Sequence, residues 1–416
     1  MADRRSTALT RRRGLALLAI ACAPIALVLG ASPALAAPVG SGDLVVYRVG
    51  DGTTALSSAA TAVFLDEFTP AGAPVQTIAL PTTGAGNQRR LTDSGSATSD
   101  GLLTRSADGA GLLLTGYDAT LGTASVTGTS AASINRVVGL LTPDGNVDTS
   151  TALTDQPSGN NVRSAAGATA TLPGSGTSGS AVAVTGGTGF LRGTTLGAQG
   201  TSSQLTTDTT NLRQVEAVDG KTFVSSSSGS LRLGYVNGST VTPLPGFPTT
   251  GSPYSFALLD EVPGVGYAGG TVDTLYVADD TSTTGGVSKY SFDGTTFVAK
   301  GTIVLASARG LAAKATATGA QLYVTTAGTT STLVALTDTT GSTGTLMATP
   351  TTLSTAPTNE AYRGVAFAPV AAPGTPPSVM PEVPLAAALP LLGLGAFGVA
   401  TSVRRRRATR AAVATA

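Results

Sequence analysis

The chain has 416 residues, of which 12% are charged and 5% aromatic; it contains no histidine, no tryptophan and one cysteine, and its formal net charge is +1. Without histidine, Ser-His-Asp triads, Cys-His dyads and imidazole metal sites are excluded, and a single cysteine excludes intrachain disulfides and structural zinc. The composition therefore points to a fold and a location more directly than to an activity.

The N-terminus has the three parts of a secretory signal. Basic residues at positions 4–13 precede an apolar stretch over 14–30, and Ala34-Leu35-Ala36 is a small-x-small cleavage site. We therefore expect residues 1–36 to be a signal peptide cleaved after Ala36. A retained membrane helix and a lipoprotein that uses Cys22 are the alternatives, and the arginines leave the choice between Sec and twin-arginine export open.

Removal of both ends changes the charge of the chain. Residues 37–382 contain 15 Lys and Arg against 23 Asp and Glu, which gives a net charge of −8. The basic surface that a nucleic-acid-binding protein needs is absent. We expect an acidic, monomeric ectodomain over 37–370 that is stabilised by burial and hydrogen bonds alone.

The ectodomain has the pattern of short β-strands. No long stretch shows a helical period, and runs rich in β-branched and aromatic residues are bounded by Gly-containing turns such as those at 144–145, 219–220 and 293–294. The clearest of these runs are Leu44–Tyr47, Ala181–Val184, Lys221–Val224, Leu275–Val277 and Leu322–Val324.

An internal repeat relates the runs to one another. An Arg followed by a small or apolar strand recurs at Arg90, Arg136, Arg163, Arg213, Arg309 and Arg363, and a weaker unit without Arg begins at Tyr254. Periods of about 40–50 residues with several strands each are typical of β-propeller blades. The sequence thus predicts an all-β propeller of six or seven blades, seven being favoured. The segment 363–367 is expected to close the ring with strand 44–47. A β-sandwich array or a β-solenoid is the alternative.

One loop has the spacing of a calcium site. Asp144, Asn146, Asp148 and Asp155 occupy positions 1, 3, 5 and 12 of a calcium-binding loop, although Thr149 replaces the glycine usual at position 6. A solvated Asp-Gly hairpin explains the first residues equally well. Calcium is the only cofactor for which the sequence offers a candidate site.

Three acidic pairs and the repeated arginines are further candidates. Neighbouring residues of a strand point to opposite faces, so no pair by itself can flank a glycosidic bond, but members of different pairs can meet at the mouth of a propeller. The pairs are Asp66-Glu67, Asp260-Glu261 and Asp279-Asp280. The arginines either line a channel and bind anions or bond the backbone of a neighbouring blade, and the second interpretation is favoured.

The C-terminus has the composition of a membrane anchor. Pro-rich residues 371–382 predict a short stalk, 383–403 are apolar and uncharged, and 404–416 begin with four arginines. Such a segment is long enough to span a bilayer, and the positive-inside rule places the tail in the cytoplasm and the ectodomain outside. We expect a transmembrane helix over 383–403.

Two resemblances accompany these patterns. The motif Pro381-Glu382-Val383-Pro384, with the apolar span and basic tail, resembles C-terminal sorting signals of the PEP-CTERM type, which implies either cleavage near the motif or a retained anchor. The phrases at 44–52, 275–280 and 362–369 resemble an uncharacterised family of exported bacterial β-propeller-like proteins. That resemblance implies the fold and no chemistry.

The sequence therefore predicts a propeller displayed at the cell membrane or cell surface. Its expected role is a non-catalytic binding module for a polysaccharide, the cell wall or a protein partner. The alternative is an extracellular hydrolase or lyase that uses carboxylates, with or without calcium, and a purely structural matrix component is a third interpretation.

Overall fold

The computed structural model describes residues 36–174, 178–328 and 330–371. Over these residues the regular elements are β-strands and two short 3₁₀ helices, η1 (Val126–Gly128) and η2 (Tyr267–Gly269), without any α-helix. In this part of the chain no helix is long and apolar enough to cross a membrane. Most of the expected signal peptide, nearly all of the stalk, the expected transmembrane helix and the basic tail lie outside the described residues.

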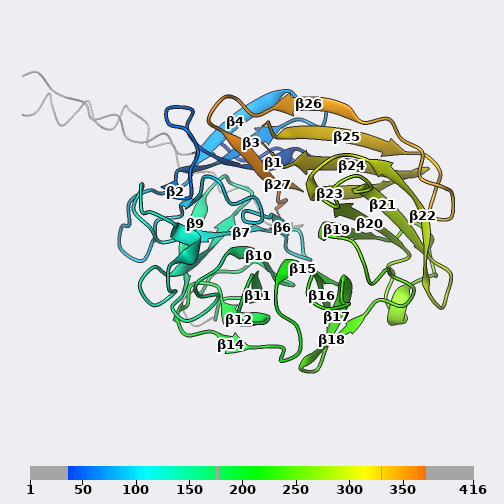
Figure 1. The fold of residues 1–416 in the computed structure, drawn as a ribbon, viewed down its shortest axis with the longest axis horizontal. Coiled ribbons are helices and arrows are strands. Elements are labelled where there is room, and N and C mark those ends of the chain that lie inside the picture. Colours follow the sequence, from blue (N-terminus) through cyan, green and yellow to red (C-terminus); the bar gives the residue numbers. More distant parts are fainter. Residues whose placement is uncertain (1–35, 175–177, 329, 372–416) are drawn as a thin grey trace, which may run out of the picture. The chain divides into compact units, whose positions relative to one another are not determined.

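The described strands form seven sheets, and Figure 1 shows the six larger ones arranged around a common centre. We number these blades along the chain, innermost strand first. Blade 1 consists of β27 (Ala361–Phe367), β1 (Leu44–Val49), β3 (Val63–Phe68) and β4 (Pro74–Ala79). Blade 2 consists of β6 (Thr104–Arg105), β7 (Leu112–Tyr117), β8 (Arg136–Leu141), β9 (Val147–Leu153) and β13 (Gln199–Gly200). Blade 3 consists of β10 (Val162–Ala166), β11 (Ala181–Gly186), β12 (Arg192–Thr195) and β14 (Ser203–Gln204).

The second half of the chain is more regular, because each blade there is four consecutive strands. Blade 4 consists of β15 (Leu212–Val218), β16 (Lys221–Ser226), β17 (Leu233–Asn237) and β18 (Thr240–Pro243). Blade 5 consists of β19 (Pro253–Leu259), β20 (Thr274–Asp279), β21 (Gly286–Phe292) and β22 (Phe297–Val304). Blade 6 consists of β23 (Ala308–Thr316), β24 (Gly319–Thr326), β25 (Thr332–Asp338) and β26 (Thr351–Thr355). A separate ribbon pairs β2 (Ala60–Thr61) with β5 (Asp93–Ser94).

The all-β propeller is confirmed, but the preference for seven blades is wrong. Arg136 lies on β8, the third strand of blade 2, and Arg90 lies in the connection between β4 and β5, where its Nε donates to Asp118 at 2.8 Å. Neither arginine begins an innermost strand. The interval between Arg136 and Arg163 is short because Arg136 lies on the third strand of blade 2, whereas Arg163 lies on the innermost strand of blade 3. It does not indicate a short blade.

The ring closes as the sequence predicts. The C-terminal strand β27 pairs antiparallel with the N-terminal strand β1, with Val45 opposite Ala366 and Leu44 opposite Phe367. Blade 1 therefore joins the two ends of the propeller. This closure confirms the expected pairing of segment 363–367 with strand 44–47.

Burial explains why the strands lack a simple alternation of polar and apolar residues. Every residue of β1, β7 and β8 is buried, because inner strands are covered on both faces by neighbouring blades. The outermost strands β4 and β22 are mostly exposed or half-buried. The inner strands consequently read as continuous apolar runs, and the outer ones tolerate Thr, Gln and Lys.

Side chains on the second strands link neighbouring blades. The hydroxyls of Thr185 and Thr325 donate to the carbonyls of Arg213 and Arg363 in the following blade, and Ser225 Oγ donates to the carbonyl of Tyr254 at 2.6 Å. All three hydroxyls are buried. The abundant threonine and serine of this sequence thus supply inter-blade hydrogen bonds in place of disulfides.

Candidate functional site in the central channel

Four of the repeated arginines lie at the start of innermost strands. Arg163, Arg213, Arg309 and Arg363 are the second or third residues of β10, β15, β23 and β27. Tyr254 takes the same place on β19, as the weaker repeat unit predicts. One end of the channel is therefore lined by cationic side chains and one tyrosine.

The arginines bond the neighbouring blade, which confirms the interpretation that the sequence favours. Arg163 Nη1 donates to the carbonyl of Leu212 at 3.1 Å and to Asn211 Oδ1 at 2.7 Å. In the next blade, Arg213 Nη1 donates to the carbonyl of Pro253 at 2.7 Å. Each guanidinium thus fixes the chain where the following innermost strand begins.

The other two arginines secure the segment that leads into blade 2. Arg309 Nη1 donates to the backbone and hydroxyl of Thr98, and Arg363 Nη2 donates to the carbonyl of Gly95 at 2.9 Å. Arg309 also forms an ion pair with Asp280 at 2.6 Å. The segment around Thr98 therefore closes part of the arginine end of the channel.

Two buried acids lie beside this segment, and the sequence pattern did not single them out. Tyr47 Oη donates to Asp93 at 2.9 Å and Tyr117 Oη donates to Asp100 at 3.0 Å. Burial raises the pKa of both carboxyls, and the charge of Asp100 raises the pKa of Asp93 further. Both acids are inaccessible, and the cavity beside Asp100 has no room for a water molecule, so they stabilise the fold and do not form an open catalytic dyad.

The opposite end of the channel holds an open pocket. Its volume is about 330 Å³, and it is lined by the last residues of the innermost strands together with Ser106 and Ala107. Pockets of roughly this size and above are typical of small-molecule sites. The wall includes Leu103, Arg105, Val218, Leu258, Leu311, Val365 and Phe367.

Glu216 is the polar group that distinguishes this pocket. It lies on β15, three residues after Arg213, is half-buried, and lines the pocket. Burial raises its pKa to about 8, although a hydrogen bond from Gln214 Nε2 opposes the rise. At neutral pH the carboxyl therefore carries its proton and can donate a hydrogen bond into the pocket.

Gln214 contacts this acid. Its Nε2 also donates to the carbonyl of Phe256 at 3.1 Å, whereas its Oε1 is buried and has no hydrogen-bond partner among the described residues. Gln214 does not line the pocket, so it positions the Glu216 carboxyl and does not contact a ligand there. The protonated Glu216 by itself can donate a hydrogen bond to a group such as a hydroxyl.

A groove adjoins the pocket. It has a volume of about 640 Å³, lies between blades 3 and 4, and shares Ala107 and Ala217 with the pocket. Its floor is mainly Ala and Gly, its sides carry the hydroxyls of Thr194, Thr195 and Ser203, and Lys221 is its charged residue. An elongated molecule can therefore extend from the pocket along the groove.

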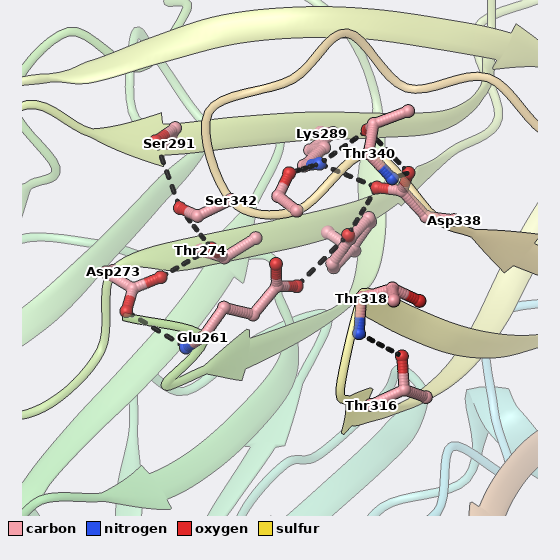
Figure 2. A network of polar contacts seen from close by, with 12 residues as sticks. Glu261, Asp273, Thr274, Lys289, Ser291, Thr316, Thr318, Asp338, Thr340 and Ser342 are labelled. Atoms are coloured by element: carbon pink, nitrogen blue, oxygen red, sulfur yellow. Dashed lines mark hydrogen bonds and ion pairs between the residues drawn. The ribbon is translucent and has the colours of Figure 1, made fainter. Parts of the chain in front are cut away.

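A second polar cluster, between blades 5 and 6, is structural (Figure 2). Lys289 is fully buried, and its three protons go to Asp338 Oδ2 at 2.6 Å, to Thr340 Oγ1 at 3.2 Å and to the carbonyl of Gly341. Tyr276 Oη lies 2.7 Å from the same Asp338 oxygen and 3.2 Å from Glu261. Because the lysine has no free donor, the cluster joins the blades and offers no reactive amine.

Burial raises the pKa of Glu261, although the nearby Lys289 opposes the rise. Burial also raises the pKa of Asp338, but the hydrogen bonds from Lys289, Thr340 and Tyr276 outweigh it, so the net shift is downward. The tyrosine has one proton for two carboxyls, and the shorter distance, to Asp338, marks the stronger of its two hydrogen bonds.

The structure does not bring the four predicted calcium ligands together. Asp144 lies in the turn between β8 and β9 and accepts from Thr142 and Asn146, whereas Asp155 follows the far end of β9 and forms an ion pair with Arg192 at 3.0 Å. At about 3.3 Å per residue, the seven residues of β9 separate the two ends by roughly 20 Å.

Asp148 is engaged separately, by Gln88 Nε2 at 2.7 Å. Over the described residues no group of three or more acidic side chains is placed to hold a metal ion. Asp144 and Asn146 therefore lie in the hairpin turn, and the four predicted ligands have separate partners.

The acidic pairs are also separated. Asp66 forms an ion pair with Arg48 at 2.5 Å in blade 1, and Asp280 forms one with Arg309 at the arginine end of the channel. Asp279 accepts from the backbone N–H groups of Ser252 and Thr281. Glu67 accepts from the Gly40 N–H and Glu261 from Tyr276, whereas Asp260 is exposed. None of these six acids lines the open pocket.

Comparisons with known proteins assign neither a family nor an activity to the chain. No protein-family model matches the chain, and no curated protein sequence is significantly similar to it. Solved structures similar to it include a putative 6-phosphogluconolactonase from Bacteroides fragilis (12% identity, TM-score 0.42, 78% of this chain and 98% of that one). Another is a GH74 enzyme from Niastella koreensis (16% identity, TM-score 0.42, 76% of this chain and 46% of that one). At these identities the likeness concerns the fold alone.

Proposed function

We propose that this protein is exported, held at the cell surface by its C-terminal segment, and displays the propeller as a non-catalytic binding module. The N-terminal signal, the apolar segment 383–403 and the basic tail support this location. The first described residues are consistent with cleavage after Ala36, because Ala37 already exchanges hydrogen bonds with Gln76 and Val39 is buried against blade 1.

The pocket at Glu216 carries the proposed binding role. It is a concave site lined by both polar and apolar groups, with the protonated Glu216 in its wall, and the groove continues from it. Every Phe and Tyr among the described residues is buried or half-buried, so this part of the surface has no exposed aromatic platform for stacking a flat sugar chain. We therefore assign the pocket to the end of a polysaccharide or cell-wall polymer, with the following units in the groove.

A hydrolase is the second candidate, and the raised pKa of Glu216 is the observation that favours it. A carboxylic acid that keeps its proton at neutral pH is suited to general acid catalysis. The other acid in the pocket wall, Asp219, is exposed and accepts a hydrogen bond from the Thr271 N–H. Since this second carboxylate is solvated at the rim, binding without cleavage is the better-supported function.

The two candidates are separated by one experiment. The full-length chain, purified in detergent, is incubated with cell walls and a panel of insoluble polysaccharides, with calcium and with EDTA. The proposal expects retention on one polymer in both buffers and no soluble sugar in the supernatant. Soluble products that disappear in the Glu216→Gln variant would instead establish the hydrolase, and no retention on any polymer would contradict a polysaccharide ligand.

A further inference from the structure

Two arginines at the closed end of the channel are only partly used by the fold. Arg163 and Arg213 are each 8% exposed. Both direct Nη1 to the neighbouring blade. Their Nε atoms are buried without a hydrogen-bond partner, and no hydrogen bond leaves Nη2 of either residue within the described chain. Each guanidinium therefore keeps one edge, Nε with Nη2, free.

Neither of these arginines has an ion pair within the described residues. Among the four channel arginines, the structure as described pairs Arg309 alone, to Asp280. The Tyr254 ring separates Arg309 from Arg213, with guanidinium carbons 4.3 and 3.8 Å from the ring centroid. Burial lowers the pKa of Arg163 and Arg213, and the positive charge of Arg309 lowers both pKa values further. The carboxylates within electrostatic reach are Asp93, Asp100 and Asp280.

The cluster consequently holds more positive than negative charge. Four guanidiniums face three carboxylates in a buried environment, where uncompensated charge is expensive. A planar Nε/Nη2 edge is the geometry with which arginine binds carboxylate, phosphate and sulfate through two parallel hydrogen bonds. Two such edges on adjacent blades point to one negatively charged ligand.

We propose that Arg163 and Arg213 form a binding site for a small inorganic oxyanion at the arginine end of the channel. The Nη1 atoms hold the blades together, and the free edges hold the anion. The site does not depend on the function proposed for the Glu216 pocket, because that pocket is lined by the opposite ends of the innermost strands. It explains why the arginines recur at one position of the repeat with unused donors.

The test is calorimetric titration of inorganic phosphate, and separately of sulfate, into the full-length chain. Arg163→Lys and Arg213→Lys keep the charge and a donor for the neighbouring carbonyl, but they lose the two-donor edge. We expect one saturable site per chain and affinity about 10- to 100-fold weaker in either variant, as for the loss of a hydrogen bond to a charged group.

Arg232→Lys is the matched control, because Arg232 also has a buried, unpartnered Nε and bonds the carbonyls of Gly229 and Leu231 away from the innermost strands. Its affinity should equal that of the unmodified chain. An anion that stays bound through purification would occupy the site and abolish the heat of titration. Ion chromatography of the denatured protein therefore accompanies the titration and detects such an anion. The proposal would be overturned if the titration released no heat and the denatured protein also released no anion. Equal affinity of Arg213→Lys and the unmodified chain would overturn it as well. Equal loss in Arg232→Lys would do the same.

Discussion

Replacement of Glu216 by Gln should stabilise the propeller at alkaline pH. The unfolded chain releases the Glu216 proton near pH 4.5, whereas the folded chain keeps it until about pH 8. Between these values the folded state binds more protons than the unfolded state, so its stability falls as pH rises, and it becomes constant above pH 8. Gln fills the same space and does not titrate.

The size of the effect follows from the shift. At about 1.4 kcal/mol per pKa unit the upper limit is about 5 kcal/mol, and partial access to solvent through the channel lowers our expectation to about 2–5 kcal/mol. Urea denaturation of both chains at pH 4, 6, 8 and 9 gives the difference in free energy of unfolding. The two should agree at pH 4 and diverge up to pH 8 in favour of the variant. A difference that does not change with pH would refute a raised pKa at this residue.

Three further outcomes are expected. Lys289→Met leaves the Asp338 carboxylate buried without its cation and should lower the free energy of unfolding by about 3–5 kcal/mol, as measured by urea denaturation. The double variant Lys289→Met with Asp338→Leu should recover most of this loss. An equal loss in both variants would contradict the ion-pair explanation. EDTA should leave the midpoint of thermal unfolding unchanged, because Asp144 and Asp155 lie at opposite ends of β9 with separate partners. A midpoint that falls in EDTA and returns when calcium is added would restore the calcium-loop hypothesis. Deletion of 383–416 should move the chain from the membrane fraction to the medium, as measured by fractionation; a chain that stays with the membrane would contradict the anchor.

The sequence predicted the architecture well because the relevant signals are local. Apolar runs bounded by glycine turns define strands, and the last such run, 363–367, has no further strands after it, which was enough to foresee closure through β1 and β27. The blade count failed at Arg136, since an arginine before an apolar strand reads the same on an innermost strand as on the third. Only pairing with β7 and β9 distinguishes the two positions.

The candidate site was harder to predict, because it is assembled from residues of five blades. Glu216 carries one local signal, an acid within the otherwise apolar end of a strand that begins with the repeated arginine. Asp93 and Asp100 lie in short, irregular segments, and their burial depends on tyrosines from β1 and β7. Spacing suggested calcium at Asp144 because the sequence does not reveal that a strand, β9, separates the ligands.

The most direct test of the proposed binding role is to block the pocket without altering its acid. Ala217 lies in the wall shared by the pocket and the groove, so Ala217→Phe should fill both, whereas Ala299→Phe places the same ring on the exposed outer strand β22. Retention of the full-length chain on the polymer that it binds should be lost in Ala217→Phe and unchanged in Ala299→Phe. Equal retention of the two variants would place the ligand elsewhere on the protein and contradict the account.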